Sequence, residues 1–168
     1  MADGLLFGLT LFSALGAGLM AGVFFAFSAF VMKALARLTP AQGFAAMQSI
    51  NVAVINRLFL SVFLGTAVVC VLLGAWSRFT WQKPGAAYLF AGSLCYLVGT
   101  FLVTVVFNVP RNDALAAVDP GSDDGASRWT AYLKAWTAWN HVRTAAALAA
   151  AAFFSLALSL PRTGGAAP

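Results

Sequence analysis

The sequence contains few charged side chains. They make up 9% of its 168 residues, whereas hydrophobic residues make up 61%; a soluble domain usually has about a quarter charged residues. No charged residue occurs in the stretches 5–32, 58–77 and 85–110, and each reaches the ~20 residues that a membrane-spanning helix needs. A fourth stretch, 144–160, is long enough if its helix begins near Ser127. The sequence therefore predicts an integral, multi-pass membrane protein without a separate soluble domain.

Side chains that bind metals are also scarce. The chain has one histidine, His141, two cysteines, and five acidic residues that all lie outside the long apolar stretches. These cannot readily form a two-histidine site or a di-iron carboxylate cluster, and there is no phosphate-binding glycine loop and no Ser-His-acid set. We therefore expect no metal and no cofactor. The alternative is a haem with His141 as one axial ligand and Met20, Met32 or Met47, or an open position, opposite.

The apolar stretches and the turns between them predict an all-α fold. Thr39, Pro40 and Gln42 match a capped helix start, and we expect Pro110 to end the third helix because the residue before a proline is biased away from helix. We expect one domain over residues 1–168, a four-helix transmembrane bundle with up-and-down topology. The expected helices are 5–35, 40–77, 84–109 and 127–160, and the fourth extends beyond the membrane at its N-terminal end. The long first apolar run, with no Lys or Arg before it, indicates a retained helix rather than a cleaved signal peptide.

In this topology the strongly polar residues gather at one end of the bundle. That end holds the start of the second helix, the end of the third and the start of the fourth, because neighbouring helices alternate in direction. The candidate residues there are Gln48, Asn51, Asn108, Arg111, Asn112, Trp136, Trp139, Asn140, His141 and Arg143. Polar and ionisable groups are costly at membrane depth, so this gathering predicts a functional pocket.

Helical periodicity divides the polar residues of the fourth helix between two faces. At 100° per residue, His141 lies off a stripe that the other polar and aromatic residues share. The stripe consists of Trp129, Tyr132, Trp136, Trp139, Asn140 and Arg143. For Trp129 and Tyr132 an aromatic belt at headgroup depth is the alternative explanation. The sequence leaves open which of the two faces points inward.

Two further features have both a structural and a functional explanation. Arg57 lies one to two turns into the predicted second helix, where it either reaches the headgroups or points inward to carbonyls, amides or an anionic ligand. Gly18 and Gly22 form a G-x-x-x-G pattern, which we expect to allow close packing of the first helix.

The net charge of +5 fits a protein that lies beside anionic lipid, and nothing indicates a nucleic-acid partner. Most basic residues belong to the polar end, so the positive-inside rule places that end in the cytoplasm; cytoplasmic termini are the alternative. The expected partners are a small hydrophobic aromatic or lipid-like ligand and membrane lipid, with a homo-oligomer as an open alternative.

Four segments carry a resemblance to a known family. They are A-G-V-F-F-A-F-S-A-F-V-M-K-A-L (21–35), M-Q-S-I-N (47–51), N-V-P-R-N-D-A-L (108–115) and W-T-A-W-N-H-V-R-T (136–144). In their order and their spread over most of the chain, they resemble the DUF1772 family of four-helix integral membrane proteins, also called the anthrone oxygenase-like family. Fungal members are associated with oxidation of an anthrone to an anthraquinone during polyketide assembly. The chain resembles the bacterial members, which implies the bacterial inner membrane.

The resemblance implies a cofactor-independent oxygenase that acts on a planar, anthrone-like aromatic. In such a reaction His141 would be the base, because imidazole is the commonest general base near neutral pH, and Asn140 and Arg143 would stabilise the oxyanion. The residues expected to contact the substrate are Trp136, Trp139, Asn108, Asn51, Gln48, Arg111 and Asn112. The alternatives are a non-catalytic membrane protein that binds a lipid, a quinone or a partner protein, and a haem-binding membrane protein.

Overall fold

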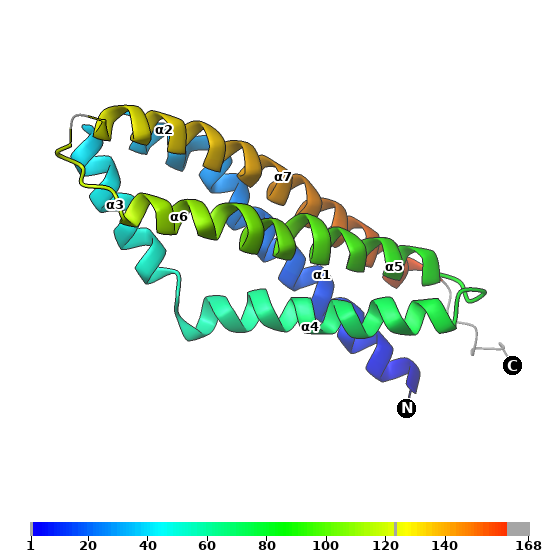
Figure 1. Ribbon diagram of the computed structural model, residues 1–168. Coiled ribbons are helices and arrows are strands. Elements are labelled where there is room, and N and C mark those ends of the chain that lie inside the picture. Colours follow the sequence, from blue (N-terminus) through cyan, green and yellow to red (C-terminus); the bar gives the residue numbers. More distant parts are fainter. Residues whose placement is uncertain (1, 123, 161–168) are drawn as a thin grey trace, which may run out of the picture.

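The computed structural model describes residues 2–122 and 124–160, and this part of the chain is helical, without a strand. Four of its helical segments are long and apolar enough to cross a membrane. They are Asp3–Leu35, Arg57–Phe79, Ala86–Ala116 and Gly125–Ser159, and they run side by side along one long axis (Figure 1). The prediction of an all-α, multi-pass membrane protein is confirmed.

The first spanning segment is a single helix with one widened turn. α1 (Ala2–Ala26) continues through the π-helical turn η1 (Phe27–Val31) into α2 (Met32–Leu35). A short turn then leads to α3 (Pro40–Ala53), where Thr39 and Gln42 form a capping box. The predicted helix start at Pro40 is therefore confirmed.

The predicted second helix is interrupted. α3 ends at Ala53, and α4 (Arg57–Phe79) begins after a break at residues 54–56. Asn56 has an extended backbone, and its side chain accepts a hydrogen bond of 2.9 Å from the backbone N–H of Phe59. The prediction of one helix over 40–77 is wrong, because Asn56 caps a new helix here instead of continuing the old one. Arg57 follows this cap with an exposed side chain, so the alternative in which it points inward is wrong as well.

The third spanning segment does not end at Pro110. It consists of α5 (Ala86–Leu94), the π-helical stretches η2 (Cys95–Leu102) and η3 (Thr104–Asn108), and α6 (Val109–Ala116). Pro110 has no backbone N–H to give to the preceding turn. The π-helical turn Thr104–Asn108 lies just before it, and Nη1 of Arg111 donates a hydrogen bond of 2.6 Å to the carbonyl of Phe107 in that turn. The predicted end at residue 109 is therefore wrong, and the helix continues to Ala116.

The last helix, α7 (Gly125–Ser159), is the central element of the bundle. α1 packs along one side of it, and α5 and η2 pack along another, while α4 packs against α5 and α1. Its 35 residues correspond to roughly 52 Å at 1.5 Å per residue, which exceeds the ~30 Å hydrocarbon core of a bilayer. The helix therefore extends beyond the membrane, and its bounds agree closely with the predicted 127–160.

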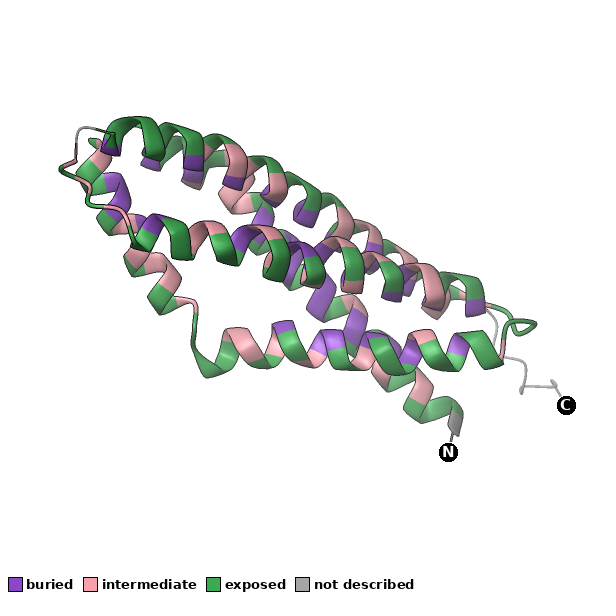
Figure 2. Cartoon of the chain, in the orientation of Figure 1, coloured by how far each residue is buried: buried purple, intermediate pink, exposed green. Residues whose placement is uncertain are grey.

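Buried residues form two clusters along the bundle. One cluster, which includes Phe63, Tyr96 and Phe154, lies among α1, α4, α5, η2 and α7. The other, which includes Phe44 and Trp129, lies at the end where α2, α3 and α6 meet the start of α7. Figure 2 shows the buried residues on the inward sides of the helices and exposed residues on their outward sides.

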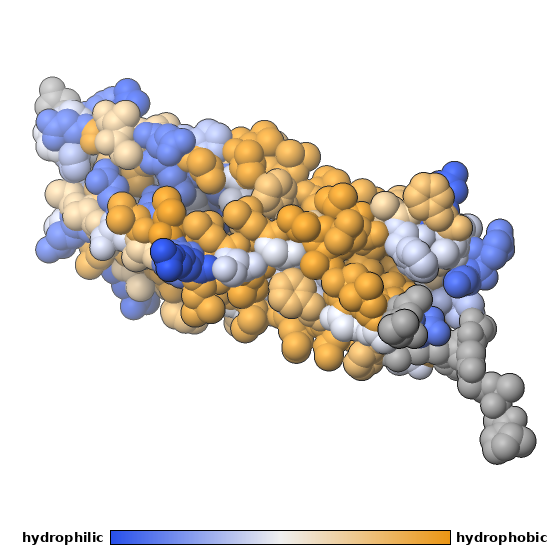
Figure 3. Space-filling view, turned by 90° about the horizontal axis from the view of Figure 1, so that it is seen from below, coloured by the Kyte–Doolittle hydropathy of each residue, from blue (hydrophilic) through white to orange (hydrophobic). Residues whose placement is uncertain are grey.

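The outward surface is apolar over the middle of the molecule. Hydrophobic residues form a broad band there, and hydrophilic residues gather toward the two ends (Figure 3). Leu58, Val68 and Leu148 are examples of large apolar side chains that are more than half exposed. A surface of this kind suits contact with lipid tails.

The close packing of the first helix does not involve the G-x-x-x-G pattern. Gly18 and Gly22 are exposed and have open space where a Cβ would lie. Gly16 makes the close approach instead, because a Cβ there would lie 2.1 Å from Oγ1 of Thr66 on α4. The predicted packing role of Gly18 and Gly22 is therefore wrong within this chain.

Candidate functional site

A cavity of about 200 Å³ lies at the end of the bundle that holds the second core cluster. Its walls come from α1, η1, α3, α4, η3, α6 and α7, which are far apart in the sequence. The polar lining residues are Asn51, Thr104, Asn108, Asn112 and Arg143. The apolar lining residues are Val23, Phe24, Phe27, Met47, Ile50, Val54, Ile55, Phe59, Leu60, Phe63, Val109 and Trp136. The fold therefore brings polar groups together inside an apolar, aromatic chamber.

Arg143 is the charged residue of this chamber. It is 4% exposed, and its guanidinium carbon lies 4.4 Å from the ring centroid of Phe24 and 4.9 Å from that of Trp136. Its Nη2 donates a hydrogen bond of 2.6 Å to Oδ1 of Asn140, and its Nη1 donates one of 3.3 Å to Oγ1 of Thr104. Two aromatic faces and two oxygen acceptors therefore hold the guanidinium in place.

No carboxylate compensates this buried charge. Among residues 2–122 and 124–160 no acidic residue lines the cavity, and the one ion pair joins Arg128 to Asp124. The Nε of Arg143 is buried without a hydrogen-bond partner. Burying an ion costs several kcal/mol unless it is paired, and contacts with aromatic faces offset only part of that cost. The cavity wall thus carries a positive charge that an anionic ligand would complement.

Asn108 is the second buried polar group of the wall. Its Nδ2 donates a hydrogen bond of 3.2 Å to the backbone carbonyl of Trp136, whereas its Oδ1 is buried without a donor. The reverse orientation of the amide would place oxygen against oxygen, so this one is the consistent choice. The wall therefore contains an unpaired acceptor on Asn108 and an unpaired donor on Arg143, and protein atoms cover both of them.

Asn112 connects α6 to α7 at the mouth of the cavity. Its Oδ1 accepts hydrogen bonds of 2.9 Å from the hydroxyl of Tyr132 and from Nε1 of Trp136. The ring of Trp136 also packs on Phe27 of η1, with centroids 5.5 Å apart. These contacts fix the indole that lines the cavity.

The comparison with protein families covers most of these elements. A family model described as anthrone oxygenase matches residues 54–153, which is more than half of the chain. The chain belongs to the anthrone oxygenase family. No curated protein and no solved structure matches it. The family resemblance of the sequence is thereby confirmed, and the matched region contains Thr104, Asn108, Trp136 and Arg143.

Several predicted site residues of this family member lie together in the cavity. Asn51, Asn108, Asn112, Trp136 and Arg143 line it. Asn140 lies directly behind Arg143 and is fully buried.

Other predicted site residues do not line the cavity. Gln48 is half-buried on α3, and Arg111 is held by its hydrogen bond to the carbonyl of Phe107. Trp139 stacks on the ring of Phe107, with centroids 3.6 Å apart and planes within 7°. The predicted substrate contacts of these three residues remain predictions that the geometry does not support.

His141 lies on the outside of the bundle. It is exposed and lines a separate groove between α7 and the first spanning segment, whereas the neighbouring Asn140 points inward to Phe24. This outcome follows from the 100° step between consecutive helical residues. The structure therefore separates the predicted base from Arg143, and the catalytic role of His141 remains an untested prediction.

The haem alternative also depends on His141. Met32 lines the same groove as His141, whereas Met47 lines the cavity of Arg143. Among residues 2–122 and 124–160 no group of three His, Cys, Asp or Glu side chains could hold a metal ion. Haem binding is a prediction that an absorption spectrum of the purified protein tests.

Two residues of the cavity wall, Phe24 and Thr104, were not predicted from the sequence. Nothing in the sequence distinguishes Phe24 from the other phenylalanines of the first apolar helix. Thr104 could have been recognised by its spacing, since it lies four residues before Asn108 and so shares its helical face.

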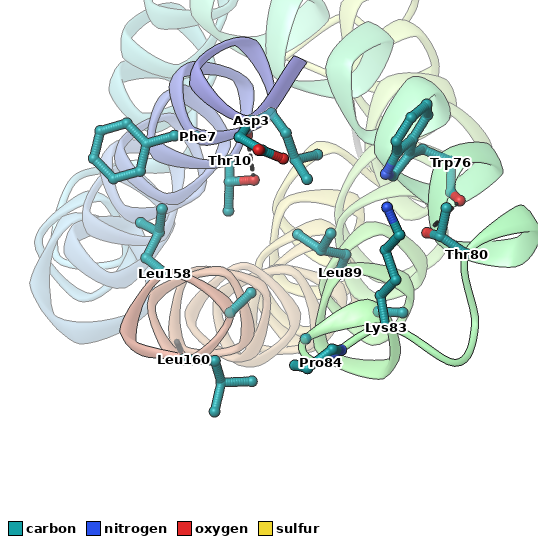
Figure 4. A pocket seen from close by; sticks show the side chains of 14 residues that line it. Asp3, Phe7, Thr10, Trp76, Thr80, Lys83, Pro84, Leu89, Leu158 and Leu160 are labelled. Atoms are coloured by element: carbon teal, nitrogen blue, oxygen red, sulfur yellow. Dashed lines mark hydrogen bonds between the residues drawn. The ribbon is translucent and has the colours of Figure 1, made fainter. Parts of the chain in front are cut away.

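A second hollow of about 190 Å³ lies at the other end of the bundle. In Figure 4, Trp76 and Lys83 lie on one side of it, and Asp3 and Thr10 of α1 lie on the other. Asp3 and Lys83 are both exposed and opposite in charge, so this hollow contains no buried, uncompensated ion. The cavity of Arg143 is therefore the candidate functional site.

Proposed function

We propose that this protein is a membrane-embedded oxygenase that oxidises a planar aromatic ketone of the anthrone type. The observation that carries the proposal is the buried guanidinium of Arg143, which faces an aromatic cavity without a carboxylate partner. Membership of the anthrone oxygenase family supports the class of substrate. The bacterial inner membrane is the proposed location.

The chemistry of an anthrone suits such a cavity. Loss of a proton from its methylene group gives an aromatic, phenolate-like anion whose negative charge lies largely on oxygen. Arg143 would stabilise that oxyanion, and a preorganised donor in an apolar site stabilises developing charge more strongly than water does. No imidazole or carboxylate is among the described lining residues, so a water molecule that enters the cavity with the substrate would take the proton.

Dioxygen would then complete the reaction without another reductant. The carbanion adds to dioxygen to form a peroxide anion, which takes back a proton to give a hydroperoxide. Loss of water from the hydroperoxide leaves the new carbonyl. Overall, the methylene carbon loses two hydrogens and four electrons, one oxygen atom enters the product, and the other leaves as water.

The remaining cavity residues would orient the substrate. Phe24 and Trp136 contribute aromatic surface to the lining, which suits a planar molecule, and Asn108 and Asn112 contribute amide groups to the same wall. Asn140 would act as a positioning residue, because it reaches Arg143 but does not line the cavity.

The experiment is an oxygen-uptake assay with the purified full-length protein in nanodiscs and 1,8-dihydroxyanthrone as substrate. We expect anthraquinone formation above the rate in empty nanodiscs, with one atom of labelled dioxygen in the product. Arg143→Gln should lower kcat by about 10²–10³-fold, the usual effect of removing an oxyanion donor, and Arg143→Lys should retain part of the activity.

His141→Ala is the matched control on the adjacent residue of α7. We expect it to keep the wild-type rate, because His141 lies outside the cavity. Loss of activity in His141→Ala with full activity in Arg143→Gln would reverse the proposed roles. Binding of the anthraquinone product without any turnover would instead support the alternative of a non-catalytic membrane protein that binds a quinone-like ligand.

A further inference from the structure

An open groove of about 480 Å³ runs along the outside of the bundle, between α7 and the end of the first spanning segment. Lys33 of α2 lines one side, and Lys134 and His141 of α7 line the other. Ser28, Met32 and Thr137 belong to the same lining. The groove therefore combines basic side chains, hydroxyl groups and a buried apolar side chain.

The basic residues of α7 follow the length of the groove. Lys134, Thr137 and His141 lie on successive turns of one face, and about 10 Å of helix separates Lys134 from His141 at 1.5 Å per residue. On the other side, Lys33 lies five residues beyond Ser28, toward the end of the helix. The two lysines therefore belong to the outer part of the groove, and Ser28 and His141 belong to the part nearer the middle of the bundle.

No negative charge balances these residues. Among residues 2–122 and 124–160 no acidic residue lines the groove, and the one ion pair there involves Arg128 and Asp124. Two lysines that line one groove repel each other weakly in water, and an anion between them removes this repulsion. The unbalanced charge indicates an anionic occupant.

We propose that this groove binds the headgroup of an anionic phospholipid. The phosphate would lie between Lys33 and Lys134, and the glycerol and ester groups would lie against the hydroxyls of Ser28 and Thr137 and the ring of His141. A membrane lipid is favoured over a free phosphate because the groove lies on the outside of two membrane-spanning segments, and exposed apolar residues such as Leu148 follow His141 on the same helix. Basic pockets between spanning helices are known to hold such headgroups.

The proposed lipid would contact the hydrogen-bond network behind the cavity. Ser28 lines the groove, and its Oγ accepts a hydrogen bond of 2.7 Å from Nδ2 of Asn140. Asn140 in turn accepts the hydrogen bond from Arg143. The lipid site does not depend on the proposed function, because it uses neither the cavity nor turnover.

Native mass spectrometry of the full-length protein tests this proposal. The protein is titrated in neutral detergent with dioleoyl phosphatidylglycerol and, separately, with dioleoyl phosphatidylcholine. We expect the first phosphatidylglycerol to bind about 25-fold more tightly than the first phosphatidylcholine. Each lysine should contribute roughly fivefold, the equivalent of ~1 kcal/mol per basic residue near an anionic lipid.

Two double variants with equal changes in charge distinguish a specific lipid site in the groove from non-specific attraction of anionic lipid to a basic protein. Lys33→Gln/Lys134→Gln removes the two lysines of the groove, and Arg37→Gln/Arg57→Gln removes two exposed arginines that do not line it. All four side chains are exposed, so both proteins should fold, which circular dichroism and size-exclusion chromatography verify. Loss of the preference in the lysine variant alone supports the proposal. Equal loss in both variants, no loss in the lysine variant, or no preference in the wild type would each overturn it.

Discussion

Arg143 donates a hydrogen bond of 2.6 Å from Nη2 to Oδ1 of Asn140, the residue three positions before it on α7. The Nδ2 of the same amide donates hydrogen bonds of 2.7 Å to the carbonyl of Phe24 and to Oγ of Ser28. Turning the amide over would place its oxygen against the Phe24 carbonyl and its N–H groups against the guanidinium, so its orientation is fixed. The first helix therefore positions the cation of the cavity through one buried amide.

Replacement of Arg143 by Met should leave the ligand-free protein as stable as the wild type, or more stable. The change removes a buried charge without an acidic partner, whose burial costs several kcal/mol, and we expect this gain to offset the loss of the donor to Oδ1 of Asn140. We expect an unchanged or higher Tm in detergent, together with loss of anthraquinone binding. A clear fall in Tm with intact ligand binding would show that Arg143 has a structural role.

Replacement of Asn140 by Leu should have the opposite effect on stability. It removes the partner of Arg143 and two further hydrogen bonds of a fully buried side chain. Each buried polar group that loses its partner costs about 1–3 kcal/mol, so we expect a lower Tm in thermal unfolding followed by tryptophan fluorescence. His141→Leu, on the exposed neighbouring position, is the control and should change Tm little.

Replacement of Asn112 by Leu should loosen α6 from α7. Tyr132 and Trp136 both donate to its Oδ1, and both donors lose their acceptor at once. We expect a loss of roughly 2–4 kcal/mol in the free energy of unfolding, because one to two buried donors become unsatisfied. Tyr132→Phe, which removes one donor together with its hydrogen bond, should cost about 1 kcal/mol. Equal effects of the two variants in chemical denaturation would contradict this account.

Replacement of Gly43 by alanine should lower the stability of the protein. A Cβ there would lie 2.4 Å from Cζ2 of Trp129, so Gly43→Ala must displace the indole that closes the second core cluster. We expect a destabilisation of about 1–3 kcal/mol, as in other overpacked cores. Gly18→Ala is the matched control, because a Cβ meets nothing within 4 Å there. It should be neutral, or stabilising by up to about 1 kcal/mol through helix propensity, and a similar loss in both variants would refute the steric explanation.

Asp124 should add a small acid-sensitive contribution at the start of α7. The hydrogen bond from Arg128, and then that from Ser122, lowers the pKa of its carboxyl below the ordinary value of 3.8. A lowered pKa in the folded state means that the contribution is present above pH 3.8 and is lost as the pH falls through the folded pKa. We therefore expect the Tm of the wild type to fall more steeply than that of Asp124→Asn below about pH 3.8. Parallel curves over this range would show that the pair contributes nothing.

The general architecture was predictable because the bilayer imposes simple requirements. Long stretches without charge, such as residues 58–77, have few alternatives to spanning helices. The separation of His141 from Arg143 was also predictable, since helical periodicity fixes the angle between neighbouring residues whatever surrounds them.

Hydropathy did not predict which side of each helix faces the core of the bundle. In lipid both the core side and the outer side of a helix are apolar, so Phe24, which lines the cavity, and Phe25, which is exposed, look the same in the sequence. The break at Asn56 and the continuation through Pro110 were missed for another reason. The break depends on a side-chain hydrogen bond to the backbone, and the continuation occurs at a π-helical turn before the proline. A count of apolar residues registers neither.

The rim of the cavity has a consequence for any kinetic study. Val23, Ile55 and Val109, which lie at its edge, are all exposed apolar residues, so reactants would enter from among the acyl chains. The concentration that governs occupancy is then the mole fraction of reactant in the bilayer, and adding inert lipid at constant total reactant dilutes it. Rates can be compared between preparations only at the same ratio of lipid to protein. An apparent KM expressed per volume of buffer would reflect partitioning of the reactant into the bilayer as much as its binding by the protein.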